Sequence, residues 1–418
     1  MLYERWRDIA ATRRDELALL DFATGRRWTF GELFADGECR QVDSSGGAFP
    51  QGQSPDFILA LLAAWRTKTI ACPLEPGQMP PLIPAPSERI IHFKSTSATS
   101  GAAKLVAFTA EQLAADAENI VATMGLRPDW PNLGVISLAH SYGFSNLVLP
   151  LLLHGIPLIL APAPLPETIR HAAAQADTIT LPAVPAMWRA WHQADAIPPN
   201  TRLAISAGAP LALPLEEEIF HASGLKIHNF LGSSECGGIA YDTSETPRTD
   251  ASFIGHSVRS VSLSLDENNC LIVQSVAVAE TYWPDSSTAL GSKIFRTSDL
   301  AELKNGQVFL RGRLSDLINV AGRKISPESI EGALLAHPQV RECLVFGVPS
   351  DEAERSEIIV AVVVASATEA GLKHFLLETL PAWQVPRRWQ FVTALPANAR
   401  GKISRAEWRR RWLMGSVS

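Results

Sequence analysis

The sequence predicts an α/β protein with two domains: a large N-terminal domain of mostly parallel sheets with helices and a small β-rich subdomain, then a small α+β C-terminal domain. Three observations predict this fold class. A chain of 418 residues is too long for one hydrophobic core. Between residues 89 and 211 short apolar runs alternate with helical patterns, which is typical of parallel sheets covered by helices. Between residues 252 and 310 strand-like runs alternate with turn sequences such as DENN and KNGQ, which favours antiparallel hairpins.

In the N-terminal domain, short apolar runs predict buried strands, and helical spacing, as at Leu113, Ala117, Ile120 and Met124, predicts the helices between them. The predicted strands are 89–93, 134–138, 156–160, 178–182 and 202–207, and the predicted helices are 111–124, 185–191 and 214–223. Further strands are predicted within 261–265, 270–278 and 307–312.

Beyond Arg313 the pattern predicts a helix in 325–340, strands at 340–348 and 357–365, a helix over 371–380 and a basic tail at 400–412. A domain boundary is therefore expected near residues 312–315. The two domains would comprise residues 1–312 and 313–418.

Composition excludes several classes of protein. Hydrophobic residues make up 46% and charged residues 19%, which excludes a mainly disordered or fibrous chain. The net charge of −6 does not indicate a nucleic-acid binder. The cysteines are scattered, with no zinc spacing, and the charged N-terminus has no apolar signal core, so a cytoplasmic protein is expected. The most apolar stretch, 147–166, contains Pro150, Gly155 and Pro157, which favours a buried strand–helix segment over a membrane span.

Two segments carry residue types that bind phosphate or metal. Ser95–Val106 (STSATSGAAKLV) follows a predicted strand, and its hydroxyls, Gly101 and Lys104 suit a flexible phosphate loop. It is not a P-loop, because Lys104 lacks the flanking Gly and Ser or Thr of that motif. In Ile227–Gly238, Glu235 stands in a Gly/Ser-rich bend, where a carboxylate can hold a phosphate-bound Mg²⁺. Ordinary solvated turns remain open alternatives for both segments.

Further residues suit a nucleotide site. Asp299, at a predicted strand end, and Arg313 are types that hold ribose hydroxyls. Lys402 follows Gly401 and can bridge a carboxylate and a phosphate. A turn aspartate, a surface arginine and a solvated basic tail are the open alternatives. His140 precedes an apolar helix and, taken alone, is more typical of a packed histidine than of a catalytic one.

Taken together and in this order, these segments resemble the motifs of the adenylate-forming superfamily, which includes acyl- and aryl-CoA synthetases, carrier-protein ligases, adenylation domains and luciferases. TSATSGAAKLV is similar to the family pattern TSGTTGxPKGV, NFLGSSE to NxYGxTE, FRTSDL to xxTGDL, and LPANARGKISR to the C-terminal lysine motif. Further matches are SLAHSYG, TLPAVPAMW, ISAGAPL, GRLSDLINVAGRKISPESIE and LVFGVPSDE. The resemblance runs from about Arg89 to Arg405, and before Arg89 it is weaker, so the N-terminal domain is expected to be shortened at its start.

The resemblance implies an AMP-forming acid–thiol ligase. A carboxylate would attack the α-phosphate of ATP to give acyl-AMP and pyrophosphate. The C-terminal domain, which the resemblance makes mobile, would then rotate, and the thiol of CoA or of a carrier-protein phosphopantetheine would take the acyl group. ATP and Mg²⁺ are thus implied as cofactors, a small carboxylic acid as substrate, and CoA or an acyl carrier protein as partner.

Carried over residue by residue, the resemblance also assigns roles. Lys402, which would contact the carboxylate and the α-phosphate, and His140 are the implied catalytic residues, and Glu235 is the implied Mg²⁺ ligand. The implied ATP-binding residues are Thr96, Ser97, Thr99, Ser100, Gly101, Lys104, Gly208, Ala209, Pro210, Asn229, Phe230, Leu231, Gly232, Ser233, Ser234, Asp299 and Arg313. The implied acyl pocket is His140, Ser141, Tyr142, Gly143 and Gly208, and the implied thiol tunnel contains Gly322.

Several residues depart from the family pattern. Ala98 and Ala103 replace a Gly and a Pro of the phosphate loop. Leu231 stands where an aromatic residue usually stacks on adenine, which should weaken nucleotide binding unless Phe230 compensates. Because Glu235, Asp299, Arg313 and Lys402 are retained, an active enzyme is favoured. Two alternatives remain open: a catalytically weak scaffold that binds nucleotide or acyl groups, and an adenylating enzyme with a non-thiol acceptor.

The sequence constrains the substrate less than the reaction. Tyr142 and Trp188 near the expected pocket favour an aromatic or short-to-medium carboxylate over a long fatty acid. Arg323, Lys324, Arg387 and Arg388 suit either the CoA phosphate or an acidic carrier protein, so the acceptor stays open.

Overall fold

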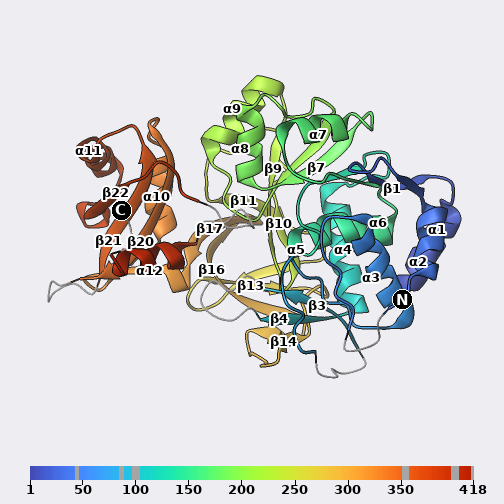
Figure 1. Cartoon of the computed structure of the whole chain (residues 1–418). Helices are drawn as coiled ribbons and strands as arrows, with labels where there is room; N and C mark the ends of the chain where they lie inside the picture. The colour runs from blue at the N-terminus through green and yellow to red at the C-terminus, as the bar shows by residue number, and fades with distance from the viewer. Residues whose placement is uncertain (43–46, 84–88, 97–103, 351–356, 397–403, 416–418) are drawn as a thin grey trace.

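The structure is a computed structural model that describes residues 1–42, 47–83, 89–96, 104–350, 357–396 and 404–415. The predicted fold class is confirmed: a large α/β domain is followed by a separate α+β domain (Figure 1). None of the described helices is long and apolar enough to cross a membrane.

The helical segments of the large domain in the described residues are α1 (Leu2–Thr12), α2 (Phe30–Cys39), α3 (Pro55–Thr67), α4 (Ala110–Met124), α5 (Ser141–Gly143), the π-helical turn η1 (Phe144–Val148), α6 (Leu149–His154), α7 (Pro166–Ala173), α8 (Pro185–Gln193) and α9 (Leu213–Ser223). Its strands are β1 (Leu17–Asp21), β2 (Arg27–Thr29), β3 (Ile90–Ser95), β4 (Leu105–Thr109), β5 (Asn132–Gly134), β6 (Leu158–Leu160), β7 (Ile179–Ala183), β8 (Thr201–Ser206), β9 (Ile227–Ser233), β10 (Gly237–Tyr241), β11 (Phe253–Ser257), β12 (Ser262–Leu265), β13 (Cys270–Gln274), β14 (Thr281–Trp283), β15 (Leu290–Gly291), β16 (Ile294–Lys304) and β17 (Gln307–Arg313). The C-terminal part contains η2 (Leu314–Asp316), β18 (Ile318–Val320), β19 (Arg323–Ile325), α10 (Pro327–Leu335), β20 (Val340–Pro349), β21 (Glu357–Ala365), α11 (Glu369–Thr379), η3 (Ala382–Gln384), β22 (Arg388–Phe391) and α12 (Arg405–Leu413).

The main sheet has a parallel half and an antiparallel half. Strands β1, β6, β5, β7, β8 and β9 are parallel neighbours in that order. From β9 the sheet continues through β10, β11, β17, β16, β13 and β12, each antiparallel to the next. The carboxyl ends of β7, β8 and β9 therefore lie side by side, which is the usual position of a ligand site in such sheets. A smaller sheet joins β14, β4 and β3.

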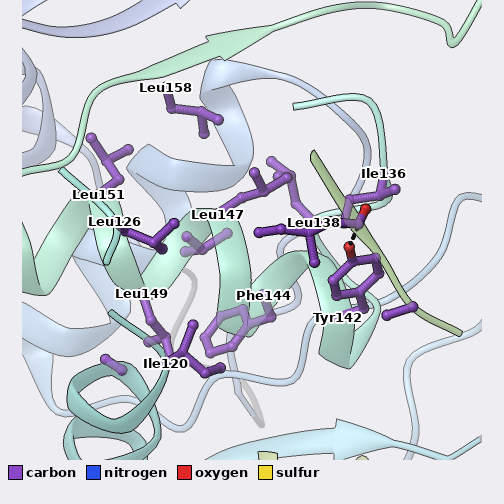
Figure 2. Packing of buried hydrophobic residues seen from close by; sticks show 14 of the residues in the cluster. Ile120, Leu126, Ile136, Leu138, Tyr142, Phe144, Leu147, Leu149, Leu151 and Leu158 are labelled. Atoms are coloured by element: carbon purple, nitrogen blue, oxygen red, sulfur yellow. Dashed lines mark hydrogen bonds between the residues drawn. The ribbon is translucent and has the colours of Figure 1, made fainter. Parts of the chain in front are cut away.

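The core of the large domain packs behind these strand ends. Ile120 of α4, Phe144 and Leu147 of η1 and Leu149 of α6 all point into one apolar cluster (Figure 2). Tyr142 belongs to the same cluster, and its hydroxyl donates to the main-chain oxygens of Ala183 and Ile205, near the ends of β7 and β8. A π-helical turn such as η1 is rare and often occurs at functional sites.

The C-terminal domain has its own cores, one on each face of the β20–β21 pair. Val345 and Ile359 pack toward α10 and α11, whereas Phe346 and Val360 pack toward α12. In Figure 1 this domain, orange to red, lies beside β16 and β17 and far from α1. The predicted boundary at residues 312–313 stays a prediction.

Two element predictions were wrong. Residues 135–138 of the predicted strand 134–138 lie outside β5, because the chain leaves the sheet to meet α5: a Cβ atom on Gly143 would lie 2.0 Å from the Ser137 carbonyl oxygen. The predicted basic tail contains the helix α12. The segment is highly charged, so the sequence pattern did not indicate a helix. It contains two tryptophans four residues apart, Trp408 and Trp412, which pack on one face of the β20–β21 pair.

The environment of His92 leads us to expect that the folded state loses stability at acidic pH. It is fully buried on β3, and neither ring nitrogen has a hydrogen-bond partner among the described residues. Burial, together with the Lys94 charge, lowers the pKa of His92 well below its usual value. Below about pH 6.5 His92 is therefore protonated in the unfolded chain and stays neutral in the folded chain. This difference lowers the free energy of unfolding by roughly 1.4 kcal/mol for each pH unit of acidification.

The His92→Leu variant is accordingly expected to lose about 2 kcal/mol less stability than the unmodified protein between pH 6.5 and pH 5. Urea unfolding at each pH measures the difference. The exposed His221 of α9, changed to Gln, is the control that should leave the pH slope unaltered. Equal pH slopes for His92→Leu and the unmodified protein would contradict the prediction.

Candidate functional site

Thr96 and Lys104 close the base of the predicted phosphate loop. Strands β3 and β4 pair antiparallel, with Ser95 opposite Leu105. Beyond that pair, the Thr96 backbone N–H donates to the Lys104 carbonyl oxygen at 2.9 Å, and the Lys104 N–H donates to Thr96 Oγ1 at 3.2 Å. The predicted residues Ser97, Thr99, Ser100 and Gly101 lie outside the described residues. The structure thus holds together the two ends of the segment that contains them.

Glu235 lies in the turn between β9 and β10. Its backbone N–H donates to Ser233 Oγ at 3.2 Å, and its carbonyl oxygen accepts from the Ala279 N–H at 2.9 Å. Its carboxylate Oε1 accepts a hydrogen bond of 3.0 Å from the Tyr282 hydroxyl. Both the main chain and the side chain of Glu235 are therefore fixed by neighbouring segments.

Tyr282 also contacts Lys104. Its ring centroid lies 5.3 Å from Lys104 Nζ, within the range of a cation–π interaction. Strand β14 reaches this position by pairing with β4, which places Tyr282 opposite Val106. The sequence analysis did not identify Tyr282, because nothing local to TYW indicates which strand it pairs with.

The predicted pocket segment meets the Glu235 turn. Ser141 Oγ donates to Ser234 Oγ at 2.9 Å. His140 caps the short helix α5: its Nδ1 accepts from the Tyr142 N–H at 3.3 Å. A neutral ring that accepts at Nδ1 carries its proton on Nε2. The structure therefore brings His140, Ser141 and Ser234 into one neighbourhood.

Gly208, Ala209 and Pro210 follow the carboxyl end of β8, beside β9. Gly208 has φ +86°, a left-handed value that glycine adopts without strain. The segment is tied to the body of the domain at Leu211, whose carbonyl oxygen accepts from Arg248 Nη2 at 2.7 Å. The predicted nucleotide segment 208–210 thus has a fixed end.

On β9, Phe230 and Leu231 point to opposite faces, as neighbouring residues of a strand do. Phe230 is only 6% exposed, and its ring lies 6.1 Å from that of Tyr142. Leu231 is the more exposed of the two, and Asn229 is buried. Phe230 therefore packs inside and does not take the place of the aromatic residue that the family pattern has at position 231. Gly232 and Ser233 complete the strand.

Asp299 and Arg313 face each other across the β16–β17 pair. Arg313 Nε donates to Asp299 Oδ1 at 2.8 Å, and the Asp299 N–H donates to Thr297 Oγ1 at 3.0 Å. No hydrogen bond or ion pair of the described residues joins this pair to the Lys104–Glu235 group. Gly322 lies in the turn between β18 and β19, and Lys402 falls outside the described residues.

A buried ion pair supports the Glu235 turn, and sequence reasoning missed it. Lys94 Nζ and Asp116 Oδ2 are 3.5 Å apart, each side chain 1% exposed, and Ser145 of η1 bonds to both. Burial lowers the pKa of Lys94, and the Asp116 carboxylate opposes that shift. Asp116 Oδ1 accepts from the Gly238 N–H at 3.2 Å, and a Cβ on Gly237 would lie 1.9 Å from that oxygen. The backbone that follows the Glu235 turn therefore contacts the Lys94–Asp116 pair directly.

The donor set around Glu235 fits magnesium. The described residues contain no group of three or more His, Cys, Asp or Glu side chains that could hold a metal by themselves. Magnesium is commonly held by one or two carboxylates together with substrate phosphates, so a single glutamate beside a phosphate loop suffices. Two open hollows of about 480 and 620 Å³ lie against α1 and between α8 and α9, away from these residues. Neither of these two hollows is lined by Lys104, Glu235 or Tyr282.

Two family models match the chain. Residues 84–283 match the model described as AMP-binding enzyme, and residues 329–402 match the AMP-binding enzyme C-terminal domain.

Among curated proteins, an acyl–CoA ligase of Bacillus subtilis described as uncharacterized is 27% identical over 246 residues, which cover 56% of this chain and 50% of that protein. Feruloyl-CoA synthase of an Amycolatopsis species is 26% identical over 358 residues, 80% of this chain and 72% of that protein. The chain thus aligns with half of the first relative and with most of the second.

Among solved structures, ATP-bound MatB from Rhodopseudomonas palustris superposes with a TM-score of 0.85 at 21% identity, and the match covers 100% of both chains. At this identity the likeness shows the fold alone.

Proposed function

Because this chain belongs to the AMP-binding enzyme family of adenylate-forming proteins, we propose that it activates a carboxylic acid with ATP and passes the acyl group to a thiol. The observation that carries the proposal is the link from Lys104 through Tyr282 to Glu235. That link supports the proposal, because the cation proposed to bind phosphate and the carboxylate proposed to bind a metal contact the same side chain, and the meeting of two anionic substrates requires both kinds of group.

In the first step, a carboxylate oxygen of the substrate attacks the α-phosphorus of ATP, the bond to the bridging oxygen breaks, and pyrophosphate leaves. Thr96 and Lys104 hold the outer phosphates, and Asp299 with Arg313 holds the ribose hydroxyls. Glu235 would hold magnesium, which would supply positive charge against the phosphates when bound. Lys402 contacts the carboxylate and the α-phosphate, where its ammonium offsets the repulsion between them.

In the second step, the C-terminal domain turns so that Gly322 lines the path of the thiol. The thiol, of CoA or of a carrier-protein phosphopantetheine, gives up its proton to solvent, its sulfur bonds to the acyl carbon, and the bond from that carbon to the phosphate oxygen breaks as AMP leaves. The proposed site residues of this domain are thus used in turn: Lys402 first, then Gly322.

The substrate we propose is an aromatic or short-to-medium acid. The Tyr142 hydroxyl donates to the carbonyl oxygens of Ala183 and Ile205, each at 3.4 Å, and buried Trp188 also donates to Ile205 at 3.3 Å. Both side chains therefore bond near the carboxyl ends of β7 and β8, and Tyr142 lies two residues after His140. Two large aromatic groups in this region support a short or planar acid over a long flexible chain.

Lys402→Ala is expected to abolish acid-dependent exchange of pyrophosphate into ATP, because no other group is proposed to meet both reacting anions. The unmodified protein is assayed over a panel of carboxylic acids, and the variant with the acid that gives the fastest exchange. Arg405→Lys, three residues further on, is not a control, since Arg405 binds Glu331 and Asp316. Arg410→Ala, on the exposed face of α12, is the control that should keep exchange.

Exchange by Lys402→Ala at the rate of the unmodified protein would remove Lys402 from the reaction. Binding of ATP without exchange on any acid of the panel would favour the scaffold alternative instead. Mass spectrometry of the product identifies the acceptor.

A further inference from the structure

Tyr282 stands between two opposite charges that the proposed reaction needs. Its ring meets the Lys104 ammonium group, and its hydroxyl meets the Glu235 carboxylate at 3.0 Å. The strand that carries it is firmly held: β14 pairs with β4, and the Glu280 N–H donates to the Ala107 carbonyl oxygen at 2.9 Å. The Glu280 carboxylate in turn accepts from Gln112 of α4 at 3.1 Å. The phenol is therefore a fixed group at this point, while Lys104 ends a long side chain.

Without the phenol, the two charges would be free to pair. The Lys104 ammonium and the Glu235 carboxylate carry opposite charges and contact the same side chain, so they attract each other. Yet none of the ion pairs in the described parts of the chain joins Lys104 to Glu235, because each is engaged by a different part of the Tyr282 side chain. A direct pair would neutralise both groups, and each would then have to be released before it could bind a phosphate or a metal.

The hydroxyl has a second effect, on the direction of the carboxylate. Carboxylates that ligate metals are usually hydrogen-bonded themselves, and loss of such a partner typically weakens metal binding 10–100-fold. The Tyr282 hydroxyl is the donor of this bond, because an ionised carboxylate can only accept. The bond to Oε1 thus fixes the carboxylate while the ring keeps the ammonium apart.

We propose that Tyr282 is a positioning residue that separates Lys104 from Glu235 and orients the Glu235 carboxylate for magnesium. The inference rests on the proposed function, since it assigns Glu235 to a metal and Lys104 to phosphate. It adds a residue from β14 that the recognised motifs do not contain. The hydroxyl orients the carboxylate for the metal, and the ring keeps the Lys104 ammonium away from that carboxylate.

Two variants of the full chain separate these roles. Tyr282→Phe keeps the ring and removes the hydroxyl, and Tyr282→Leu removes both. Calorimetric titration with ATP, once with Mg²⁺ and once with EDTA and no acid present, measures binding without turnover. For Tyr282→Phe we expect ATP affinity to fall roughly 10–100-fold with Mg²⁺ and to stay unchanged with EDTA. For Tyr282→Leu we expect a loss in both conditions, because Lys104 is then free to pair with Glu235.

Trp283→Phe is the matched control on the same strand, since Trp283 packs against Phe93 in a separate apolar cluster. It should leave ATP affinity unchanged in both conditions. Equal affinity of Tyr282→Phe and the unmodified protein with Mg²⁺ would overturn the inference, as would a loss of the same size with Mg²⁺ and with EDTA. Absence of ATP binding by the unmodified protein would instead overturn the proposed function itself.

Discussion

Replacing Glu216 by Leu is expected to lower the free energy of unfolding by about 3–5 kcal/mol, as loss of one member of a buried ion pair does. Glu216 of α9 is fully buried, with Lys226 Nζ 2.5 Å from Oε1 and Arg248 Nε 2.8 Å from Oε2. The two cations are themselves almost completely buried. Without Glu216, Lys226 keeps only the Asp242 carboxylate, 2.7 Å away, and Arg248 has no carboxylate partner among the described residues.

The measurement is urea unfolding at neutral pH. Glu217→Leu is the matched control, because Glu217 is the next residue of the same helix and is exposed, so a change of no more than about 0.5 kcal/mol is expected. A similar small change for Glu216→Leu would mean that the buried network does not stabilise the fold. Arg248 also holds the Leu211 carbonyl oxygen, so Glu216→Leu should weaken ATP binding as well.

Asp299→Ala is expected to raise the KM for ATP in the exchange assay by at least about 100-fold, with a smaller effect on kcat. Hydrogen bonds from two ribose hydroxyls to an ionised carboxylate are charge-assisted and contribute about 1.5–3 kcal/mol each. Most of this free energy is present equally in the ground state and in the transition state, so the change falls on KM. Nucleotide affinity by calorimetry provides an independent measure.

Glu302→Ala serves as the comparison for that experiment. Glu302 lies on the same strand and also pairs with an arginine, Arg311, at 2.6 Å, but the family resemblance gives it no role. Its removal should leave the KM for ATP unchanged. An equal rise in KM for both variants would indicate general damage to the β16–β17 pair, and no rise for Asp299→Ala would exclude Asp299 from the ribose site.

The local sequence pattern predicted most helices and strands correctly. It failed where tertiary packing or a high local charge determined the structure. The spacing from Leu113 to Met124 predicts α4, and in the structure Thr109 and Gln112 cap its start reciprocally while Gly125 ends it. The apolar run 134–138 looks like a strand, but its second part turns away from the sheet. There the Ser137 carbonyl packs closely against Gly143, a contact that the local pattern of 134–138 does not indicate.

The candidate site divides in the same way. Motif order alone predicts Lys104, Glu235, Asp299 and Arg313 as site residues, since their sequence neighbours resemble the motifs of the family. Motif order gave no sign of Tyr282 or of the Lys94–Asp116 pair. None of these three residues is of an unusual type for its position in the sequence. Their contacts depend on which strands and helices lie side by side in the fold.

The sequence by itself therefore determined the class of fold, the family and the charged groups available for chemistry, because these are written in composition, periodicity and local motifs. The tertiary structure alone decided which groups touch: a tyrosine from β14 contacts both a lysine and a glutamate, and a buried aspartate, paired with a lysine, bonds to the backbone next to the turn that carries this glutamate. The physical reason is that such contacts join residues far apart in the chain, and their partners are selected by strand pairing and burial, which no local pattern encodes.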